Sequence, residues 1–473
     1  MVGAADTGAS FEPTLWSENF TRGPAVNAAS IIIKAPTGRS RLPIVELNES
    51  AVRQDRKQIR VRRGSAKRAQ LDSSFGNFSR TLDIRAWRFY HAAKKTEFTT
   101  SFSRNRANEL GLVFAHEYRE FFTWTHENLR RTDRTVFGVE DFFSSALAGR
   151  FGEAAAYLTM VSLGYVYWDR IAVLAERAMK SAVITHSDCL RRGRAVRARL
   201  GVNQPDLEPD FAFENMQQQV ALVEAKGSVV DPERDDPSTK DDLRHALRQI
   251  DAWATMILPT PHKYYAIGTY FREESDSSDD PSLIAVVDPP AASDPEVEPI
   301  EFPPDWIRRG NYGAWLRTMG LNESGNALVT VRKGTGAGFV LPVMTIGKYE
   351  FAVLPRGLVE HSGQSMRQGS YVEMLMDFLS WGVRPFFDRL GHPISPASSS
   401  CSILLFGLEV GVFQHVARAL ASPSEPVLLQ VESIADDQSA EWFSGSTLPD
   451  GSMVGTIRPG HSPPPTRMQE FVL

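Results

Sequence analysis

Three residues near the middle of the chain have the side-chain types and the spacing needed for metal-assisted hydrolysis. Asp210 follows a proline and opens an alternating Phe-Ala-Phe run, and a second apolar run, Val220 to Val223, ends in Glu224-Ala225-Lys226. Carboxylate oxygens are the ligands that a hard divalent cation prefers, and a lysine can orient a water and offset developing negative charge. These residues therefore predict a site that holds a divalent cation and activates water beside a phosphodiester.

The expected strands would bring these side chains together. Residues two apart on a strand face the same way, so Glu224 and Lys226 project to one side of the sheet and Ala225 to the other. Asp210, at the start of the preceding strand, can complete a cluster with Glu224 and the backbone carbonyl of Ala225. Asp206 also follows a proline, but it lies in an expected turn, so Asp210 is the favoured ligand.

Hydrophobic periodicity predicts the elements that position the site. Apolar residues from Phe143 to Val161 recur at helical spacing, and Gly164 is expected to end this helix. The elements expected after it are strands at 165–168, 211–214 and 220–226, a helix from 238 or 239 to 257, and strands at 264–271 and 283–287. A basic, helical insert up to about residue 200 is expected between the first two of these strands. The order up to residue 271 is helix, three strands, helix, strand.

In these motifs the chain resembles the PD-(D/E)xK phosphodiesterases, a superfamily that includes restriction endonucleases, junction resolvases and phage-type exonucleases. The resemblance covers roughly residues 136 to 290. It rests on Asp210 after its proline, on the spacing of Glu224 and Lys226, and on a preceding helix that carries Glu153. It implies an α/β fold, a restriction-endonuclease-like mixed sheet flanked by helices, whose core has the element order expected here. The insert between the first two strands is long for this pattern, and no subfamily is matched.

The resemblance also implies roles for individual residues. Asp210 and Glu224 would hold Mg²⁺ or Mn²⁺, and Lys226 would be the base that activates water. Glu153 corresponds to an acidic residue that many members place near the metal, although it equally fits an ordinary helix surface. Gln249 corresponds more loosely to a helix glutamine of exonuclease-like members, and a polar residue beside an apolar stripe is normal on any surface helix.

Charge is distributed unevenly along the chain, although the formal net charge is only -5. Residues 1 to 200 hold 32 Lys and Arg against 20 Asp and Glu, and residues 201 to 473 hold 20 against 37. Two basic clusters in the first part would contact the phosphates of a nucleic acid, or would form a solvated surface. Their members are Arg53, Arg56, Lys57, Arg60, Arg62, Arg63, Lys67 and Arg68, and then Arg191, Arg192, Arg194, Arg197 and Arg199.

Length and composition predict three parts and a location. At 473 residues the chain exceeds the usual size of a single core, and an acidic stretch rich in Pro and Ser at 273–304 marks a domain edge. We expect a basic, partly helical N-terminal region at 1–135, the nuclease-like domain at 136–290 and a C-terminal α+β domain at 291–473. No membrane-length apolar run, leader pattern or disulfide framework is evident, which favours a soluble cytoplasmic protein.

Further expectations concern the flanking α+β regions. The N-terminal part is expected to become helical at 108–130. In the C-terminal part we expect helices at 306–319 and 371–379, strand-like runs at 328–331, 339–341, 350–354, 403–406 and 427–431, and an extended Pro-rich tail at 459–465. The glycine-rich segment after residue 332 lacks the Gly-Lys-Ser/Thr ending of a phosphate loop, so a turn is expected there.

The resemblance and the basic clusters together favour a magnesium-dependent nuclease that acts on DNA, in restriction or phage defence by analogy with the family. RNA is an alternative substrate, because the hydrolysis does not itself distinguish the sugars. A third interpretation is a non-catalytic protein that binds nucleic acid or a partner on the same scaffold. If a chain with one active site cuts both strands of a duplex, a homodimer is favoured. The acidic C-terminal domain could dock a protein regulator, and no membrane partner is expected.

Overall fold

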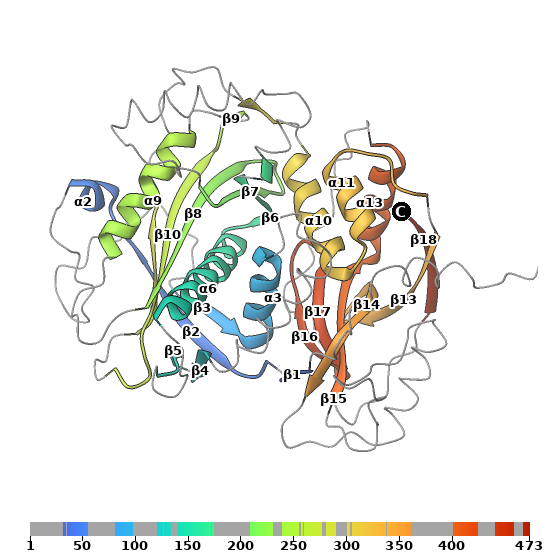
Figure 1. Ribbon diagram of the computed structural model, residues 1–473, viewed down its shortest axis with the longest axis horizontal. Coiled ribbons are helices and arrows are strands. Elements are labelled where there is room, and N and C mark those ends of the chain that lie inside the picture. The colour runs from blue at the N-terminus through green and yellow to red at the C-terminus, as the bar shows by residue number, and fades with distance from the viewer. Residues whose placement is uncertain are drawn as a thin grey trace, which may run out of the picture.

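The computed structural model describes two seven-stranded β-sheets, two short two-stranded sheets and the helices packed on the large sheets (Figure 1). The described residues are 32–34, 36–54, 81–97, 121–125, 127–133, 141–171, 173–174, 209–229, 239–254, 257–258, 260–276, 281–289, 300–302, 305–336, 338–360, 401–423, 440–457 and 467–473. Within these ranges no helix is both long and apolar enough to cross a membrane.

The central sheet has seven strands in the order β3-β2-β11-β10-β8-β7-β6. They are β2 Arg39–Glu46, β3 Thr81–Arg85, β6 Tyr165–Arg170, β7 Phe211–Asn215, β8 Val220–Val229, β10 Lys263–Phe271 and β11 Leu283–Val287. β7 runs antiparallel to β6 and to β8, whereas β10 lies parallel to β8 and antiparallel to β11. The apolar first half of β8 is buried on both faces, as expected of a central strand covered on both sides.

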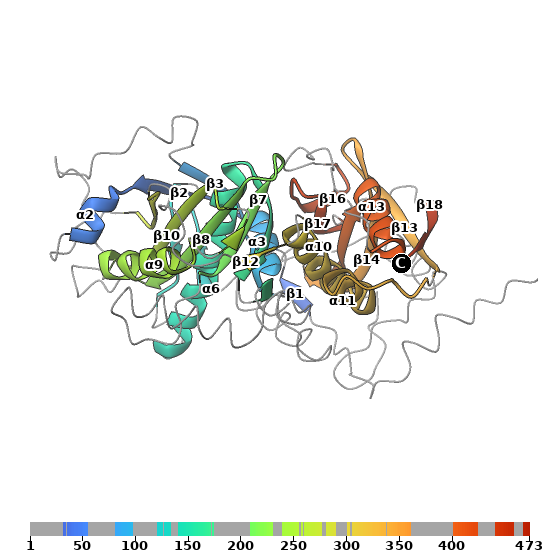
Figure 2. The ribbon, with the colours of Figure 1, turned by 90° about the horizontal axis from the view of Figure 1, so that it is seen from above.

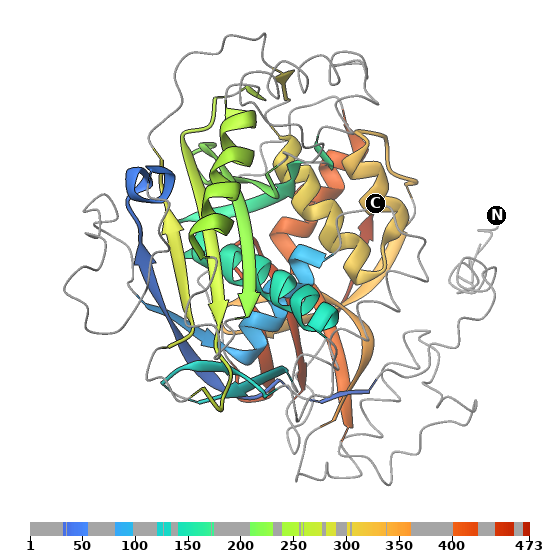
Figure 3. The same ribbon diagram turned by 60° about the vertical axis from the view of Figure 1, so that its left-hand side comes forward.

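Helices cover the two faces of this sheet. They are α3 Ala86–Glu97, α6 Asp141–Ser162 and α9 Thr239–Ala254. α6 packs with the face that bears Val223 and Ala225, and α9 packs with the opposite face, which bears Leu222. Figure 3 shows both helices against β8 and β10. α6 ends as expected before Gly164, whose φ of 87° lies in the left-handed region that glycine adopts without strain.

The element order expected around the site is confirmed, because α6, β6, β7, β8, α9 and β10 follow one another along the chain. The sheet also extends past the expected boundary at residue 136. β2 pairs in parallel with β11 and antiparallel with β3, so strands from the N-terminal part lie at the edge of the central sheet. An unpaired edge exposes backbone hydrogen-bonding groups, and these added strands satisfy those of β11. The N-terminal part is therefore built into the central sheet.

The helix expected at 108–130 is wrong for its described residues after Phe121. These residues form two strands, β4 Phe122–Trp124 and β5 Leu129–Arg131. The two strands pair as a short antiparallel hairpin. The ring centroid of Phe122 lies 4.6 Å from that of Phe151 in α6 and 5.2 Å from that of Phe271 in β10. Burial of this ring in an aromatic cluster favours an extended course over the local helical pattern.

The second sheet has the order β16-β17-β15-β14-β13-β18, with β1 beside β14. Its strands are β1 Ile32–Lys34, β13 Gly338–Ile346, β14 Tyr349–Glu360, β15 Cys401–Glu409, β16 Phe443–Thr447, β17 Ser452–Ile457 and β18 Arg467–Val472. One face is covered by α10 Trp306–Met319, α11 Asn322–Val329 and α13 Val410–Ala421. The remaining short elements are α2 Glu49–Gln54, β9 Ile257–Leu258 and β12 Ile300–Glu301.

Helix α10 lies between the two sheets (Figures 1 and 2). Toward the central sheet, Arg308 Nε donates a 2.8 Å hydrogen bond to Glu214 Oε1 of β7. Toward the second sheet, Trp315 Nε1 donates a 2.8 Å hydrogen bond to the backbone oxygen of Gly407 in β15. A single hydrophobic cluster includes residues of α9, α10 and both sheets, so the two sheets share one core.

Other expectations for the C-terminal part can be compared with the structure. The helix at 306–319 and the strands at 339–341, 350–354 and 403–406 are confirmed. The strand expected at 328–331 is wrong, because α11 continues to Val329 and buries Leu328 in the shared core. Residues 332–336 form no helix or strand, as expected for the glycine-rich segment. The expectations at 371–379, 427–431 and 459–465, and the insert up to residue 200, fall outside the described residues.

Candidate active site

Strands β7 and β8 place Asp210 beside Glu224. Phe211 pairs with Val223 in the antiparallel register, so the residue before Phe211 lies next to the residue after Val223. The backbone amide of Asp210 donates a 2.9 Å hydrogen bond to Glu224 Oε2, and the amide of Ala225 donates one of 2.9 Å to Asp210 Oδ2. The two carboxylates predicted from the sequence are therefore brought together, and each is held by a backbone amide of the other strand.

Lys226 and Gln249 join the same cluster. Lys226 Nζ donates to Glu224 Oε1 and, over 2.9 Å, to Gln249 Oε1 on α9. This contact is possible because the alternation along β8 turns Glu224 and Lys226 to the face that α9 covers. The side chain of Glu224 is 1% exposed and that of Lys226 is 26% exposed, so the carboxylate is buried while the ammonium group reaches solvent.

Glu153 reaches the site through Arg170, which no sequence motif indicated. Arg170 is the last residue of β6, and its Nη2 binds the carboxylate of Glu153 while Nη1 lies 3.9 Å from Asp210 Oδ1. Nη2 also donates a 3.1 Å hydrogen bond to the backbone oxygen of Thr96, and the guanidinium lies 4.9 Å from the ring centroid of Phe211. The only sequence signal for Arg170 was an arginine at the end of an aromatic, apolar strand.

Burial changes the protonation of the carboxylates. Burial and then the neighbouring carboxylate of Asp210 raise the pKa of Glu224 to about 8, although the Lys226 ammonium acts in the opposite direction. Burial also raises the pKa of Glu153, and the guanidinium of Arg170 opposes that effect. This shift favours the protonated form of Glu224, whereas a divalent cation placed beside it would favour the ionised form.

Asp210 and Glu224 form a donor set that fits Mg²⁺ or Mn²⁺. Among the residues that the structure describes, no group of three or more His, Cys, Asp and Glu side chains gathers closely enough to enclose a metal by itself. Mg²⁺ does not require such a cage, because it keeps several waters and commonly binds one or two carboxylates together with substrate phosphates. The backbone carbonyl of Ala225 would add a further oxygen of the kind that this cation prefers.

Glycines let α6 approach β8 directly beside the site. A Cβ atom on Gly227 would lie 1.8 Å from the backbone oxygen of Ala148, and one on Gly152 would lie 2.6 Å from Cα of Gly227. No side chain fits between these backbones, so both positions require glycine. Gly227 thereby sets the distance between the strand that carries Lys226 and the helix that carries Glu153.

Of the basic residues predicted to contact nucleic acid, only Arg53 lies in the described part of the chain. Its guanidinium donates to Glu49 over 2.5 Å and to both carboxylate oxygens of Asp251, over 2.6 and 2.8 Å, so its charge is already offset. The residues outside the described ranges are Arg56, Lys57, Arg60, Arg62, Arg63, Lys67, Arg68, Arg191, Arg192, Arg194, Arg197 and Arg199.

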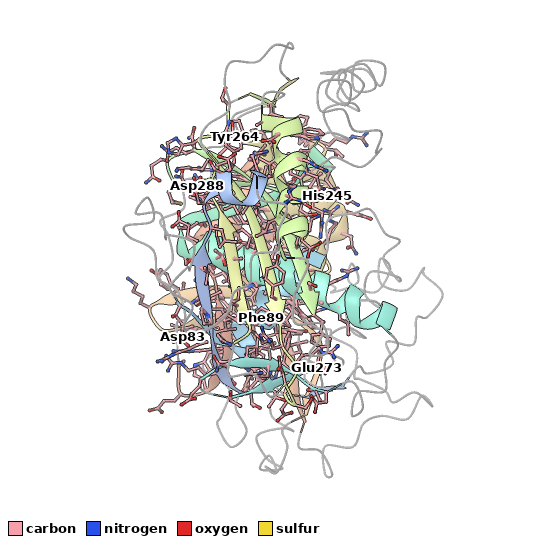
Figure 4. The ribbon with its side chains drawn as sticks, turned by 90° about the vertical axis from the view of Figure 1, so that its left-hand side faces the viewer. Asp83, Phe89, His245, Tyr264, Glu273 and Asp288 are labelled. Atoms are coloured by element: carbon pink, nitrogen blue, oxygen red, sulfur yellow. The ribbon has the colours of Figure 1, made fainter. Side chains whose placement is uncertain are left out.

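His245 of α9 lies near Lys226 and Arg248, which the sequence did not indicate. His245 projects from α9 one turn before Gln249 (Figure 4). Burial lowers the pKa of His245, and the charges of Lys226 and Arg248 lower it further. Arg248 is exposed.

Comparison with known proteins gives no family for this chain. No protein-family model, curated protein or solved structure matches it. The described part of the chain is mixed α/β, with two seven-stranded sheets and two short two-stranded sheets. Because one fold can carry many activities, a functional conclusion has to rest on the geometry of the site.

Proposed function

We propose that this chain hydrolyses phosphodiester bonds in nucleic acid with the help of Mg²⁺ or Mn²⁺. The observation that carries the proposal is the cluster of Asp210, Glu224 and Lys226, with its carboxylates on neighbouring strands and its lysine on the same strand face as Glu224. Glu224 is buried within β8 and is paired with Lys226. Burying a carboxylate costs folding free energy, and a divalent cation beside it would offset that cost further.

Each residue of the cluster has its own task in this proposal. Asp210, Glu224 and the carbonyl of Ala225 would hold the cation, which when bound makes a water more acidic and offsets charge on the phosphate. Lys226 is held by the 2.9 Å hydrogen bond to Gln249, and would orient the attacking water and donate to a phosphate oxygen as negative charge develops. Gln249 is then a positioning residue for the lysine.

The fold that we propose is the restriction-endonuclease-like fold of the PD-(D/E)xK phosphodiesterases. Support comes from the element order α6, β6, β7, β8, α9, β10 and from the antiparallel strands β6, β7 and β8 followed by the parallel strand β10. The positions of Asp210 before β7 and of Glu224 and Lys226 within β8 agree with the motif of that superfamily. DNA as the substrate, and a role in restriction or phage defence, rest on analogy with its members.

Cleavage assays test the chemistry directly. The whole purified chain is incubated with plasmid, linear duplex, single-stranded DNA and RNA in Mg²⁺, in Mn²⁺ and in EDTA. We expect cleavage of DNA with either metal and none in EDTA. Asp210→Asn, Glu224→Gln and Lys226→Met are each expected to lower the rate by about a hundredfold or more, because each removes a group that acts on the reacting phosphate or water.

Matched variants outside the site serve as controls. Asp83→Asn removes an exposed carboxylate that pairs with Arg39, and Lys348→Met removes an exposed lysine between β13 and β14. Both should cleave at the wild-type rate. Undiminished cleavage by the Asp210 and Glu224 variants would overturn the site. Cleavage of RNA alone would replace DNA as the substrate, and duplex binding without metal binding or cleavage would support the non-catalytic interpretation.

A further inference from the structure

We propose that Arg170 binds the phosphodiester of the substrate and that Glu153 positions this arginine rather than holding the cation. The inference rests on the proposed function and names a further substrate contact of the same site. Arg170 stands at the end of β6, next to Asp210 at the start of β7. Its guanidinium forms an ion pair with Asp210, one of the two proposed carboxylate ligands.

The guanidinium of Arg170 is held from two sides. Its Nη2 donates both to the carboxylate of Glu153 on α6 and to the backbone oxygen of Thr96 at the end of α3. Its plane is supported by the ring of Phe211, at 4.9 Å from the centroid. These contacts restrict a long side chain that would otherwise lose rotamer freedom on binding a ligand. Arg170 is therefore preorganised before substrate arrives.

The other terminal nitrogen of Arg170 faces the site. Nη1 lies 3.9 Å from Asp210 Oδ1, which is longer than a hydrogen bond, and the Arg170 side chain is 21% exposed. This nitrogen lies beside the carboxylate that would hold the cation, where a phosphate oxygen of the substrate would be bound. A guanidinium matches the oxygens of a phosphate in charge and in geometry, so the phosphodiester is the group expected there.

Glu153 approaches from a different side than the proposed ligands. Glu224 faces α9, and Asp210 is bound to the amide of Ala225 beside it. Glu153 belongs to α6 on the opposite face, and its carboxylate is paired with Arg170. A role as metal ligand would break that pair and leave a mostly buried guanidinium without its partner, which is costly. The arrangement therefore assigns Glu153 to Arg170.

Duplex binding separates these roles without relying on turnover. Fluorescence anisotropy of a labelled short DNA duplex is measured with Ca²⁺ in place of Mg²⁺, for the wild type, Arg170→Met, Arg170→Lys and Glu153→Gln. We expect Arg170→Met to weaken binding by about ten- to a hundredfold, the loss typical of a hydrogen bond to a charged group. Arg170→Lys should retain only part of the wild-type affinity, because lysine lacks the planar guanidinium group that can donate two parallel hydrogen bonds. Glu153→Gln should weaken binding less, and should add nothing to Arg170→Met in the double variant.

The matched control is Arg467→Met. It removes the same charge from an exposed arginine that pairs with Glu350 on the second sheet. It should bind the duplex as the wild type does. Circular dichroism melts confirm that each variant is folded, and Arg170→Lys keeps the test valid if Arg170→Met does not fold.

Calorimetric titration with Mg²⁺ alone tests the role of Glu153. We expect Glu153→Gln to bind Mg²⁺ with wild-type affinity, whereas Asp210→Asn loses about tenfold or more, the effect expected for loss of a charged ligand. Equal losses in both variants, or wild-type duplex binding by Arg170→Met, would overturn the inference. A wild-type chain that cleaves no nucleic acid in Mg²⁺ or Mn²⁺ would instead remove the proposed function. If the wild type cleaves normally and Arg170→Met keeps the wild-type KM and duplex affinity, this inference is wrong but the proposed function stands.

Discussion

Asp210 and Glu224 are joined by a 2.9 Å hydrogen bond from the backbone amide of Asp210 to Oε2 of Glu224, although they lie on different strands. The amide of Ala225 returns a 2.9 Å hydrogen bond to Asp210 Oδ2. The backbone of the central sheet therefore sets the spacing of the two carboxylates, rather than the side chains alone. A pair held in this way would be preorganised for the proposed cation. Burial, and then the charge of Asp210, raise the pKa of Glu224 in this arrangement.

Mg²⁺ should stabilise the folded chain through this pair. A ligand that binds only the folded state raises the melting temperature, and we expect a rise of a few degrees at saturating Mg²⁺. Glu224→Gln and Asp210→Asn should abolish the rise, whereas Asp83→Asn, which alters an exposed carboxylate on β3, should retain it. Differential scanning calorimetry with Mg²⁺ and with EDTA gives the comparison. The same rise in Glu224→Gln would show that the cation binds elsewhere.

Gly227 should tolerate no side chain. A Cβ atom there would lie 1.8 Å from the backbone oxygen of Ala148, so Gly227→Ala must move α6 away from β8. We expect it to lower the free energy of unfolding by about 3 kcal/mol or more. Gly149→Ala, on the same helix with open space at its Cβ position, should be neutral or stabilising by about 0.5–1 kcal/mol. Urea denaturation of both variants checks this, and equal stabilities would contradict the close packing of α6 on β8.

The buried pair of Lys95 and Asp450 should be essential for joining α3 to the second sheet. Lys95 Nζ binds Asp450 Oδ2, both side chains are buried, and Asn311 Nδ2 donates a further 2.9 Å hydrogen bond to the same oxygen. Burial by itself would raise the pKa of Asp450, but Lys95 and the hydrogen bonds lower it below its usual value. Lys95→Met leaves that carboxylate unpaired and should destabilise the chain by about 3–5 kcal/mol.

The control for that pair is the exposed pair of Arg39 and Asp83. Arg39→Met should change the free energy of unfolding by less than about 1 kcal/mol, because water solvates both charges. Denaturant unfolding, followed by tryptophan fluorescence, compares the two variants. Similar losses for Lys95→Met and Arg39→Met would show that the Lys95 pair is not buried as described.

Glu214 should make stability depend on pH. Burial raises the pKa of Glu214 to about 7, although the guanidinium of Arg308 acts in the opposite direction. Because this pKa is higher in the folded state than in the unfolded chain, the folded state binds the extra proton. The contribution to stability is therefore fully present below the unfolded pKa and is lost as pH rises through about 7.

Urea unfolding at pH 5 and pH 8 measures this contribution. From pH 5 to pH 8 the free energy of unfolding of the wild type should fall by up to about 3 kcal/mol more than that of Glu214→Gln, because the glutamine cannot ionise. Glu350→Gln, an exposed carboxylate on β14 that pairs with Arg467, should parallel the wild type. If Glu214→Gln follows the wild type instead, ionisation of Glu214 is not what makes stability fall with pH.

The local pattern of apolar and polar residues was sufficient to predict the helices and strands around the site. The apolar repeat that predicts α6, the alternation that predicts β7 and the apolar run that predicts β8 are properties of adjacent residues, and each element forms where expected. The side-chain alternation along β8 also placed Glu224 and Lys226 on one face correctly, because the period of a strand does not depend on what packs against it. The link between Lys226 and Gln249 agrees with that alternation.

Local pattern failed where distant contacts decide the conformation. Phe122 lies in a strand because its ring is buried against Phe151 and Phe271, which no neighbouring residue encodes. Leu328 lies in a helix because α11 covers the shared core. Arg53, expected to meet phosphates, is bound to Asp251, 198 residues further along the chain. Propensity is a weak guide in such places, since tertiary packing overrides it.

The sequence by itself determined the types, the spacing and the strand faces of Asp210, Glu224 and Lys226, because these follow from short-range periodicity. Only the tertiary structure decided that N-terminal strands complete the central sheet and that Glu153 meets Arg170. It also decided that Gly227 admits α6 against β8. These relationships depend on how sheet twist and helix packing bring remote segments together, and the free energy that selects them comes from burial shared across the whole core.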